Sequence, residues 1–521
     1  MNKHFPDGYY PSGYLLKSAS YRSWLTGLGV LASLGGLLAA ALQSPSSDLP
    51  LELTSLDTAD RSVSVHLFEW TWSDIAQECE AFLGPQGFEA VQISPPQEHV
   101  VVPESGFPWW QRYQPVSYQL VSRSGDRAQL KDMVQRCRQA GVAVYADAVI
   151  NHMAAIDTAA GSAGTQFRRY HYPGLYNPED FNACRSSAID YQDAEQVTQC
   201  ELVSLPDLNT ASTQVQTTLV GYLADLADLG IEGFRIDAAK HIRSHELGAI
   251  LNQVRDRIEP DPYIYQEVID PGTEAIKKHD YYSLGDVVEF EYGRHLGEAF
   301  LNVGDRTLAN LQTLDADGGL TPSDQAVIFI DNHDKQRGHG GGGNYLTYKD
   351  GPLHTLAKVF MLAHPYGKPR IMSSYRFTHS DQGPPADVSG RTQTVYAPDF
   401  LGCQGAWVCE HRQPEVAAMV RFRAATQSVP RVTDWWSNGS NQIAFGRGDL
   451  GFVVINREET PLSHTFQTQL PPGRYCEVLH ASTNPAHCDA LITVDEQGQF
   501  QATVGAMDAI AIHQGDRGHR N

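Results

Sequence analysis

The stretch Phe329-Ile-Asp-Asn-His-Asp-Lys-Gln-Arg337 runs from two apolar residues into a cluster of acid, amide and imidazole side chains. Because every ionisable group at the end of a strand must be solvated or paired, such a cluster is more typical of a chemical site than of a structural element. The same pattern recurs in Val142-Ala-Val-Tyr-Ala-Asp-Ala-Val-Ile-Asn-His152, Gly233-Phe-Arg-Ile-Asp-Ala-Ala-Lys-His241 and Tyr263-Ile-Tyr-Gln-Glu267. Four apolar strands with polar carboxyl ends predict a (β/α)8 barrel.

Four further β-rich runs, at 62–68, 89–93, 286–290 and 370–372, complete the predicted barrel, and helical patterns such as 130–140 and 213–229 follow strands. In such a barrel the active site lies at the carboxyl ends of the strands. The side chains expected to converge there are Asp147, Asn151, His152, Arg235, Asp237, Glu267, His333 and Asp334.

The predicted domain organisation follows from the barrel. Residues 61–152 and 206–426 form the catalytic barrel, and 153–205 form a loop-rich insertion after the third strand. Strand-like runs at 442–445, 452–455, 475–478 and 506–513 predict an antiparallel β-sandwich domain over 427–514, followed by a tail at 515–521. Residues 1–50 contain an apolar run after Lys17 and Arg22, which predicts a cleaved signal peptide or an uncleaved signal anchor, followed by a linker.

Composition narrows the classes of partner. A chain of 521 residues with a formal net charge of −22 would be repelled by nucleic acid and by an anionic membrane surface, so neither is an expected partner. A membrane contact is expected only if the N-terminal apolar segment is uncleaved. Eight cysteines in an exported chain indicate disulfides, although the count alone allows many pairings.

The four polar strand ends resemble the short conserved regions of the α-amylase family of glycoside hydrolases, and the resemblance extends from about residue 62 to 513. Several motifs are similar to the animal-type, chloride-dependent members: Pro108-Trp-Trp-Gln-Arg-Tyr-Gln-Pro-Val-Ser-Tyr118, Arg337-Gly-His-Gly340, Met372-Ser-Ser-Tyr-Arg376, Trp407-Val-Cys-Glu-His-Arg412 and Asn438-Gly-Ser-Asn-Gln-Ile-Ala-Phe-Gly-Arg447. The resemblance implies that 153–205 corresponds to domain B of the family and 427–514 to domain C. It also implies that the glycine-rich run 338–343 is a mobile loop over the cleft.

The resemblance also implies roles for single residues. Asp237 matches the nucleophile, Glu267 the general acid/base, and Asp334 the third carboxylate at the cleavage point. Arg235 lies two residues before Asp237, on the same face of the strand, where it can keep the nucleophile ionised. Matches to substrate-binding residues are Trp109, Trp110, Tyr113, Asp147, His152, Tyr191, Arg235, Lys240, His241, His333 and His339.

Two ions and four disulfides are implied in the same way. The matching calcium ligands are the side chains of Asn151 and Asp207 and the backbone carbonyls of Thr198 and His241, a hard oxygen set. Thr198 stands where relatives commonly have Arg, a departure that a carbonyl ligand tolerates. The matching chloride ligands are Arg235, Asn332 and Arg370, and the matching disulfides are Cys79–Cys137, Cys184–Cys200, Cys403–Cys409 and Cys476–Cys488.

Together these features predict a secreted, monomeric, endo-acting α-amylase that hydrolyses internal α-1,4-glucosidic bonds of starch or glycogen with retention, contains calcium and is activated by chloride. One alternative is a transglycosylating or branching enzyme of the same family, which would share the three carboxylates. A catalytically inactive carbohydrate-binding relative is another, but it predicts a lost carboxylate, and Asp237, Glu267 and Asp334 are all present.

Overall fold

The computed structural model describes residues 62–314, 319–397, 400–480, 488 and 490–516. The predicted signal segment at 1–50 and residues 517–521 of the predicted tail lie outside this part of the chain. Within the described residues, no helix combines the length and the apolarity needed to cross a membrane.

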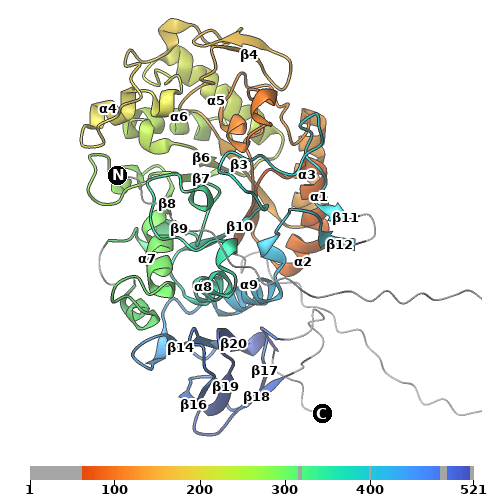
Figure 1. Cartoon of the computed structure of the whole chain (residues 1–521), viewed down its shortest axis with the longest axis vertical. Helices are drawn as coiled ribbons and strands as arrows, with labels where there is room; N and C mark the ends of the chain where they lie inside the picture. The colour runs from red at the N-terminus through yellow and green to blue at the C-terminus, as the bar shows by residue number, and fades with distance from the viewer. Residues whose placement is uncertain (1–61, 315–318, 398–399, 481–487, 489, 517–521) are drawn as a thin grey trace, which may run out of the picture. The chain divides into compact units, whose positions relative to one another are not determined.

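Eight parallel strands form a closed barrel, as predicted. Around the barrel the order is β1, β2, β3, β6, β7, β8, β9 and β10, and β10 pairs with β1 to close it (Figure 1). Most strand residues are buried on both faces, which is typical of a parallel sheet covered by helices. The strands are β1 Ser64–Leu67, β2 Ala90–Ile93, β3 Ala143–Ala148, β6 Gly233–Ile236, β7 Tyr263–Gln266, β8 Asp286–Glu289, β9 Ala326–Ile328 and β10 Lys368–Ser373.

Helices follow the strands and bury apolar side chains against the barrel. In α3, for example, Leu130, Met133 and Val134 are buried, and a capping box between Asp126 and Gln129 fixes its start. The helices are α1 Trp72–Glu78, α2 Gly84–Gln86, α3 Arg127–Gln139, α5 Thr213–Asp228, α6 Ser244–Arg255, α7 Phe290–Phe300, α8 Pro352–Ala363 and α9 Pro414–Thr426.

The segment between β3 and α5 contains little regular structure. Its elements are β4 Thr158–Ala160, which pairs with β5 Gln166–Arg168, and the short helix α4 Ala194–Gln199. The Cys184–Cys200 disulfide joins the end of α4 to the preceding loop. Because the segment leaves the barrel directly after β3, its loops lie at the carboxyl end of the strands, where an active site is expected.

The C-terminal region is all β, as predicted. It contains a four-stranded antiparallel sheet in the order β13-β14-β15-β20 and the pairs β16-β19 and β17-β18, around a core that includes Phe452, Phe466 and Phe500. The strands are β13 Thr433–Ser437, β14 Gln442–Arg447, β15 Gly451–Asn456, β16 Leu462–Gln467, β17 Gly473–Cys476, β18 Leu491–Val494, β19 Gln499–Val504 and β20 Asp508–His513; a further pair, β11 Tyr396–Ala397 and β12 Phe400–Cys403, precedes α9.

Several strand boundaries differ from the prediction by a few residues, and the end of β9 is the one that bears on the site. We expected Phe329 to lie in a strand, but β9 ends at Ile328 and the chain bends at Ile330. Both Phe329 and Ile330 remain buried, so their apolarity reflects burial rather than strand pairing. The bend directs the polar residues that follow into the barrel mouth.

All four implied disulfides are confirmed, and they use all eight cysteines.

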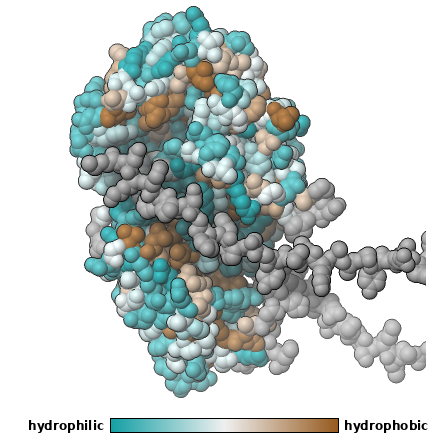
Figure 2. All heavy atoms as spheres, viewed as in Figure 1, coloured by the Kyte–Doolittle hydropathy of each residue, from teal (hydrophilic) through white to brown (hydrophobic). Residues whose placement is uncertain are grey.

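The surface is in keeping with the formal net charge of −22. The face in Figure 2 is mostly hydrophilic, with small scattered hydrophobic groups. Among the described residues, the large hydrophobic side chains with high exposure include Val203, at 74%.

Candidate active site

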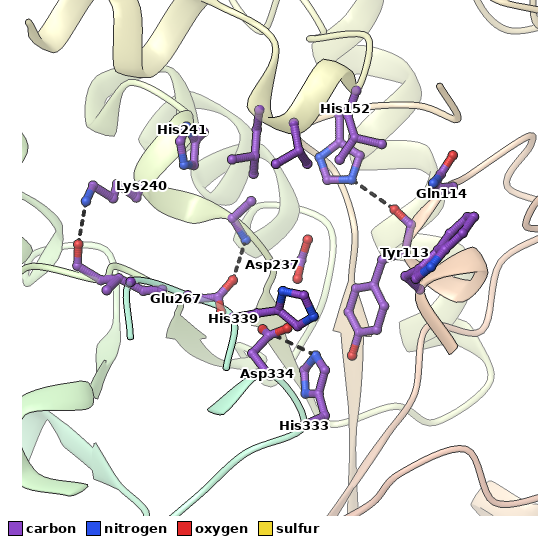
Figure 3. A pocket seen from close by; sticks show the side chains of 18 of the residues that line it. Tyr113, Gln114, His152, Asp237, Lys240, His241, Glu267, His333, Asp334 and His339 are labelled. Carbon is purple, nitrogen blue, oxygen red and sulfur yellow. Dashed lines mark hydrogen bonds and ion pairs between the residues drawn. The ribbon is translucent and has the colours of Figure 1, made fainter. Parts of the chain in front are cut away.

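A cavity of about 650 Å³ lies where the chain leaves the carboxyl ends of several barrel strands. Twelve of the residues predicted from the sequence line it: Trp109, Trp110, Tyr113, His152, Tyr191, Asp237, Lys240, His241, Glu267, His333, Asp334 and His339. Figure 3 labels most of these residues, His339 among them.

Arg235 joins three of the carboxyl groups. It lies on β6 and is buried, and its Nη1 contacts Asp147 Oδ1 at 2.6 Å and Asp237 Oδ1 at 2.8 Å. Its Nη2 contacts Glu267 Oε1 at 2.8 Å, while Glu267 Oε2 accepts a hydrogen bond from the backbone N–H of Ala238 at 2.9 Å. One guanidinium therefore holds the carboxyls that follow β6 and β7 close together.

The electrostatics of this cluster favour retention of protons. Burial raises the pKa of Asp147, and it raises the pKa of Asp237 well above its usual range although Arg235 opposes the change. Burial and the nearby Glu267 raise the pKa of Asp334 to about 7. Burial thus favours the protonated forms of Asp147, Asp237 and Asp334, and carboxyls this close together titrate as a cluster.

Two of the imidazoles that line the cavity, those of His152 and His333, favour the neutral form. Burial and the charge of Arg235 lower the pKa of His333 well below its usual range, and burial lowers that of His152 to about 4. His333 Nε2 lies 3.6 Å from Asp334 Oδ2, and His152 Nε2 lies 2.9 Å from the carbonyl oxygen of Tyr113 (Figure 3). Neutral rings can hydrogen-bond hydroxyl groups without adding charge to the site.

Aromatic side chains form one wall of the cavity. Trp109 and Tyr113 lie on the 3₁₀ helix Trp109–Tyr113, with a ring-centroid distance of 5.8 Å. Tyr113 also stacks on His333 at 5.0 Å and donates a hydrogen bond from its hydroxyl to Asp147 Oδ2 at 2.8 Å. Trp109 is only 6% exposed, so these rings combine a packing role with a surface facing the cavity.

At another side of the cavity, Lys240 donates to the backbone carbonyl of Ile269 at 2.6 Å and forms an ion pair with Glu274. Its ammonium lies 4.8 Å from the ring centroid of Tyr191. His241 Nδ1 lies 2.8 Å from the carbonyl of Val197 in α4, so the segment after β6 contacts the insertion.

Seven predicted site residues do not line the cavity. Asp147 and Arg235 lie beneath it, as their contacts to Asp237 and Tyr113 show. Asn332 and Arg370 are buried in the barrel, and Asn332 Oδ1 accepts from the backbone N–H of Lys335 at 2.8 Å. The remaining three, Asn151, Thr198 and Asp207, belong to the predicted calcium site.

The predicted calcium ligands fit a hard cation. Asp207 Oδ1 is buried and has no hydrogen-bond partner among the described residues, while its Oδ2 accepts from Asn182 at 2.7 Å. Burial raises the pKa of Asp207 well above its usual range, against hydrogen bonds from Asn182 and Asn151. The Thr198 carbonyl accepts one bond, from Gln199 at 2.7 Å, and keeps a second lone pair. A buried carboxylate oxygen without a partner, together with the amide and carbonyl oxygens of the other predicted ligands, is a donor set of the kind that suits Ca²⁺.

Of the predicted chloride ligands, Arg370 fits an anion, whereas Arg235 already contacts three carboxyls. Arg370 is 4% exposed and, within the described part of the chain, forms no ion pair with a carboxylate. Its Nη1 donates to Gln92 Oε1 at 2.8 Å, and its guanidinium lies 5.9 Å from the Tyr265 ring centroid. A buried positive charge whose partners are neutral is the environment that a small anion would stabilise.

Several residues that line the cavity were not predicted from the sequence: Gln114, Leu202, Val203, Leu205, Ala238, Ile269 and Glu274. Leu202 and Val203 come from an insertion without clear periodicity, where no pattern marks an inward side chain. Val203 has a positive φ of 44°, rare for a β-branched residue, and this conformation has no signature in the sequence.

Comparison with known proteins shows which family models and which relatives the chain matches. The α-amylase catalytic-domain model matches residues 87–290, and the α-amylase C-terminal all-beta-domain model matches 435–515. An α-amylase of Tribolium castaneum is 46% identical over 471 residues, which cover 87% of this chain and 94% of that protein. A pancreatic α-amylase of Rattus norvegicus is 41% identical over 487 residues, covering 88% and 95%.

Solved structures of α-amylases agree with the sequence comparisons. The wild-type α-amylase I of Eisenia fetida superposes with a TM-score of 0.82 at 39% identity, covering 87% of this chain and 97% of that one. A mutant of the same enzyme, solved as a complex with maltohexaose, superposes equally well. This chain therefore belongs to the α-amylase family and is a glycoside hydrolase of the α-amylase type.

Proposed function

We propose that this enzyme hydrolyses internal α-1,4-glucosidic bonds of starch or glycogen by a retaining double displacement. Asp237 is the nucleophile, Glu267 the general acid/base, and Asp334 binds and distorts the sugar at the cleavage point. The family relationship and the maltohexaose complex of a relative support a glucan substrate.

The observation that carries the proposal is the shared guanidinium of Arg235. Its two terminal nitrogens contact Asp237 and Glu267, each at 2.8 Å. Retaining enzymes hold their two carboxyls about 5 Å apart, whereas inverting enzymes leave a larger gap for water. Two carboxyls on one guanidinium favour the shorter separation, and both face the same cavity.

The first step needs one protonated and one ionised carboxyl. Glu267 gives its proton to the glycosidic oxygen while an Asp237 oxygen bonds to the anomeric carbon, and the leaving chain departs as an alcohol. Arg235, bonded to Asp237 Oδ1, favours the ionised form of the nucleophile. In the second step Glu267 removes a proton from water, which displaces Asp237 and releases the product with its configuration retained.

The remaining cavity residues bind the glucan. We assign sugar hydroxyl contacts to His152, His333 and His339, and stacking on the apolar faces of glucose units to Trp109 and Trp110. Tyr191, Lys240 and His241 bind units at the other side of the cleavage point. Tyr113 and Asp147 act together, since their hydrogen bond at 2.8 Å couples the wall of the cavity to Arg235.

Two ions complete the proposal. Asn151, Thr198, Asp207 and His241 would hold calcium, which supplies a fixed crosslink between the barrel and the insertion. Arg235, Asn332 and Arg370 would hold chloride, which offsets the buried positive charge near Glu267. With chloride bound, the guanidinium of Arg235 would bond less strongly to Glu267, the proposed proton donor. We also propose that the enzyme is secreted, in agreement with its four disulfides, and that it acts as a monomer.

Product analysis with two variants tests the proposal. Wild-type enzyme should abolish the iodine staining of soluble starch rapidly and release short oligosaccharides. Asp237→Asn and Glu267→Gln should fold normally and each lose about four or more orders of magnitude in turnover, since each removes a group that acts in the transition state. Near-wild-type hydrolysis by either variant would contradict the assignment.

A further inference from the structure

The glycine-rich loop, residues 338–343, forms part of the cavity wall but has little packing of its own. His339, Gly340 and Gly341 line the cavity. A Cβ atom placed on Gly341 or Gly342 would meet no atom within 4 Å, so no neighbour holds the loop there. Gly340 and Gly342 have φ values of 67° and 72°, which other residues rarely adopt. Packing therefore contributes little to holding the loop at Gly341 and Gly342.

Lys335 supplies the contacts that packing does not. Its Nζ donates to the carbonyl oxygens of Gly340 at 2.5 Å and Gly342 at 2.8 Å. The same ammonium lies 4.5 Å from the ring centroid of Tyr345 and 5.4 Å from that of Phe290. Two carbonyls and two aromatic faces thus surround one cation.

The loop carbonyls in return stabilise the buried ammonium of Lys335. Its side chain is 8% exposed, and it forms no ion pair with a carboxylate among the described residues. Charge-assisted hydrogen bonds are stronger than neutral ones, and a buried ammonium without partners is costly. If the loop moved away, Lys335 would lose both carbonyl partners. The closed arrangement of the loop is therefore the one that the ammonium favours.

The backbone connects this contact to the carboxylate at the cleavage point. Lys335 directly follows Asp334, and its own N–H donates to Asn332 Oδ1 at 2.8 Å. The N–H of His339 donates to the carbonyl of Asp334 at 3.0 Å. One end of the loop is thus tied to Asp334 by backbone, and its middle is tied to the same segment through the Lys335 side chain.

We propose that Lys335 is a positioning residue whose ammonium holds the glycine-rich loop against the cleft and so sets where His339 meets the glucan. Lys335 does not line the cavity, so it acts on substrate through the loop. The glucan part of this inference rests on the proposed function, whereas the contact between Lys335 and the loop does not. When a binding-competent conformation is populated only in part, the apparent affinity falls by that fraction.

Hydrogen exchange of the substrate-free enzyme tests the contact directly. Lys335→Met keeps the apolar stem and removes the ammonium, and we expect exchange within 338–343 to rise about tenfold as the open population grows. Lys335→Arg should restore most of the protection. Lys277→Met is the matched control, because this lysine also donates to a glycine carbonyl, that of Gly272 at 2.9 Å, but lies outside the cavity lining. Unchanged exchange in Lys335→Met would overturn the proposal.

Kinetics test the consequence for substrate. Lys335→Met should raise KM for a maltooligosaccharide about tenfold with a smaller change in kcat, and Lys335→Arg should recover KM. If hydrogen exchange in the loop rises in Lys335→Met but KM does not change, the positioning role is overturned. If Lys335→Met does not fold, Tyr345→Leu removes one aromatic face and should shift exchange and KM in the same direction. A wild-type enzyme that cleaves no glucan would refute the proposed function, while the exchange experiment would still decide the contact.

Discussion

Replacing Asp334 by Asn separates a structural role of this carboxylate from a chemical one. A structural acid would be stabilised by an ion pair, so its loss would destabilise the fold. Among the described residues, Asp334 instead forms no ion pair with Lys or Arg; His333 Nε2 lies 3.6 Å away, and burial together with Glu267 raises the pKa of Asp334 to about 7. We therefore expect Asp334→Asn to stabilise the fold while activity falls about a thousandfold or more.

The magnitude follows from the two pKa values. Raising the pKa from 3.8 to about 7 corresponds to about 4 kcal/mol of destabilisation once both states are ionised. The Asp334 side chain is 21% exposed, so solvent screening reduces the effect, and we expect a gain of about 2 kcal/mol in the variant at pH 8. Between pH 3.8 and about 7 the folded state binds more protons than the unfolded state, so this contribution lowers wild-type stability as pH rises.

Urea unfolding at pH 4, 6 and 8, followed by tryptophan fluorescence with saturating calcium and chloride, measures the difference. The two proteins should have similar unfolding free energies near pH 4, and the variant should be progressively more stable towards pH 8. A variant that is less stable than wild type at pH 8, or that shows the same pH dependence, would refute the reasoning.

Two further predictions concern the ions. Chelation of calcium should lower Tm and expose 153–205 to protease, because an ion bound only by the native state stabilises it; an unchanged melting curve in excess chelator, with no calcium found by elemental analysis, would contradict the site. Wild-type enzyme in a non-binding anion at matched ionic strength should be much less active than in chloride, with the alkaline limb of its pH profile moved to lower pH. Arg370→Gln should make activity largely indifferent to chloride while leaving the fold intact, and superimposable wild-type profiles in the two anions would exclude a functional chloride site.

The barrel was predictable because each strand is a short apolar run that ends in polar residues. The run containing Arg235 and Asp237 shows this most clearly, since the structure places one on β6 and the other directly after it. The boundary of β9 was not predictable, because Phe329 and Ile330 are as apolar and as buried as the strand before them. Hydrophobicity reports burial and does not report where hydrogen bonding between strands ends.

The site was predictable where residues carry a strand-end pattern and obscure where they depend on loop conformation. His152 and Glu267 follow strands, and the structure brings both to the cavity. Val203 reaches the cavity through a left-handed turn that its side chain disfavours, and no local pattern indicates it. The sequence gives no sign that Lys335 differs from other charged residues. The structure shows that its ammonium lies between two loop carbonyls.

The most direct test of the central claim is the anomeric configuration of the first products. Proton NMR of freshly released oligosaccharides, recorded before mutarotation, distinguishes the two outcomes of displacement at the anomeric carbon. With Asp237 and Glu267 held on the guanidinium of Arg235, we expect α-configured products that drift towards the equilibrium mixture with time. Products released first in the β configuration would contradict a retaining mechanism and the role proposed for Asp237.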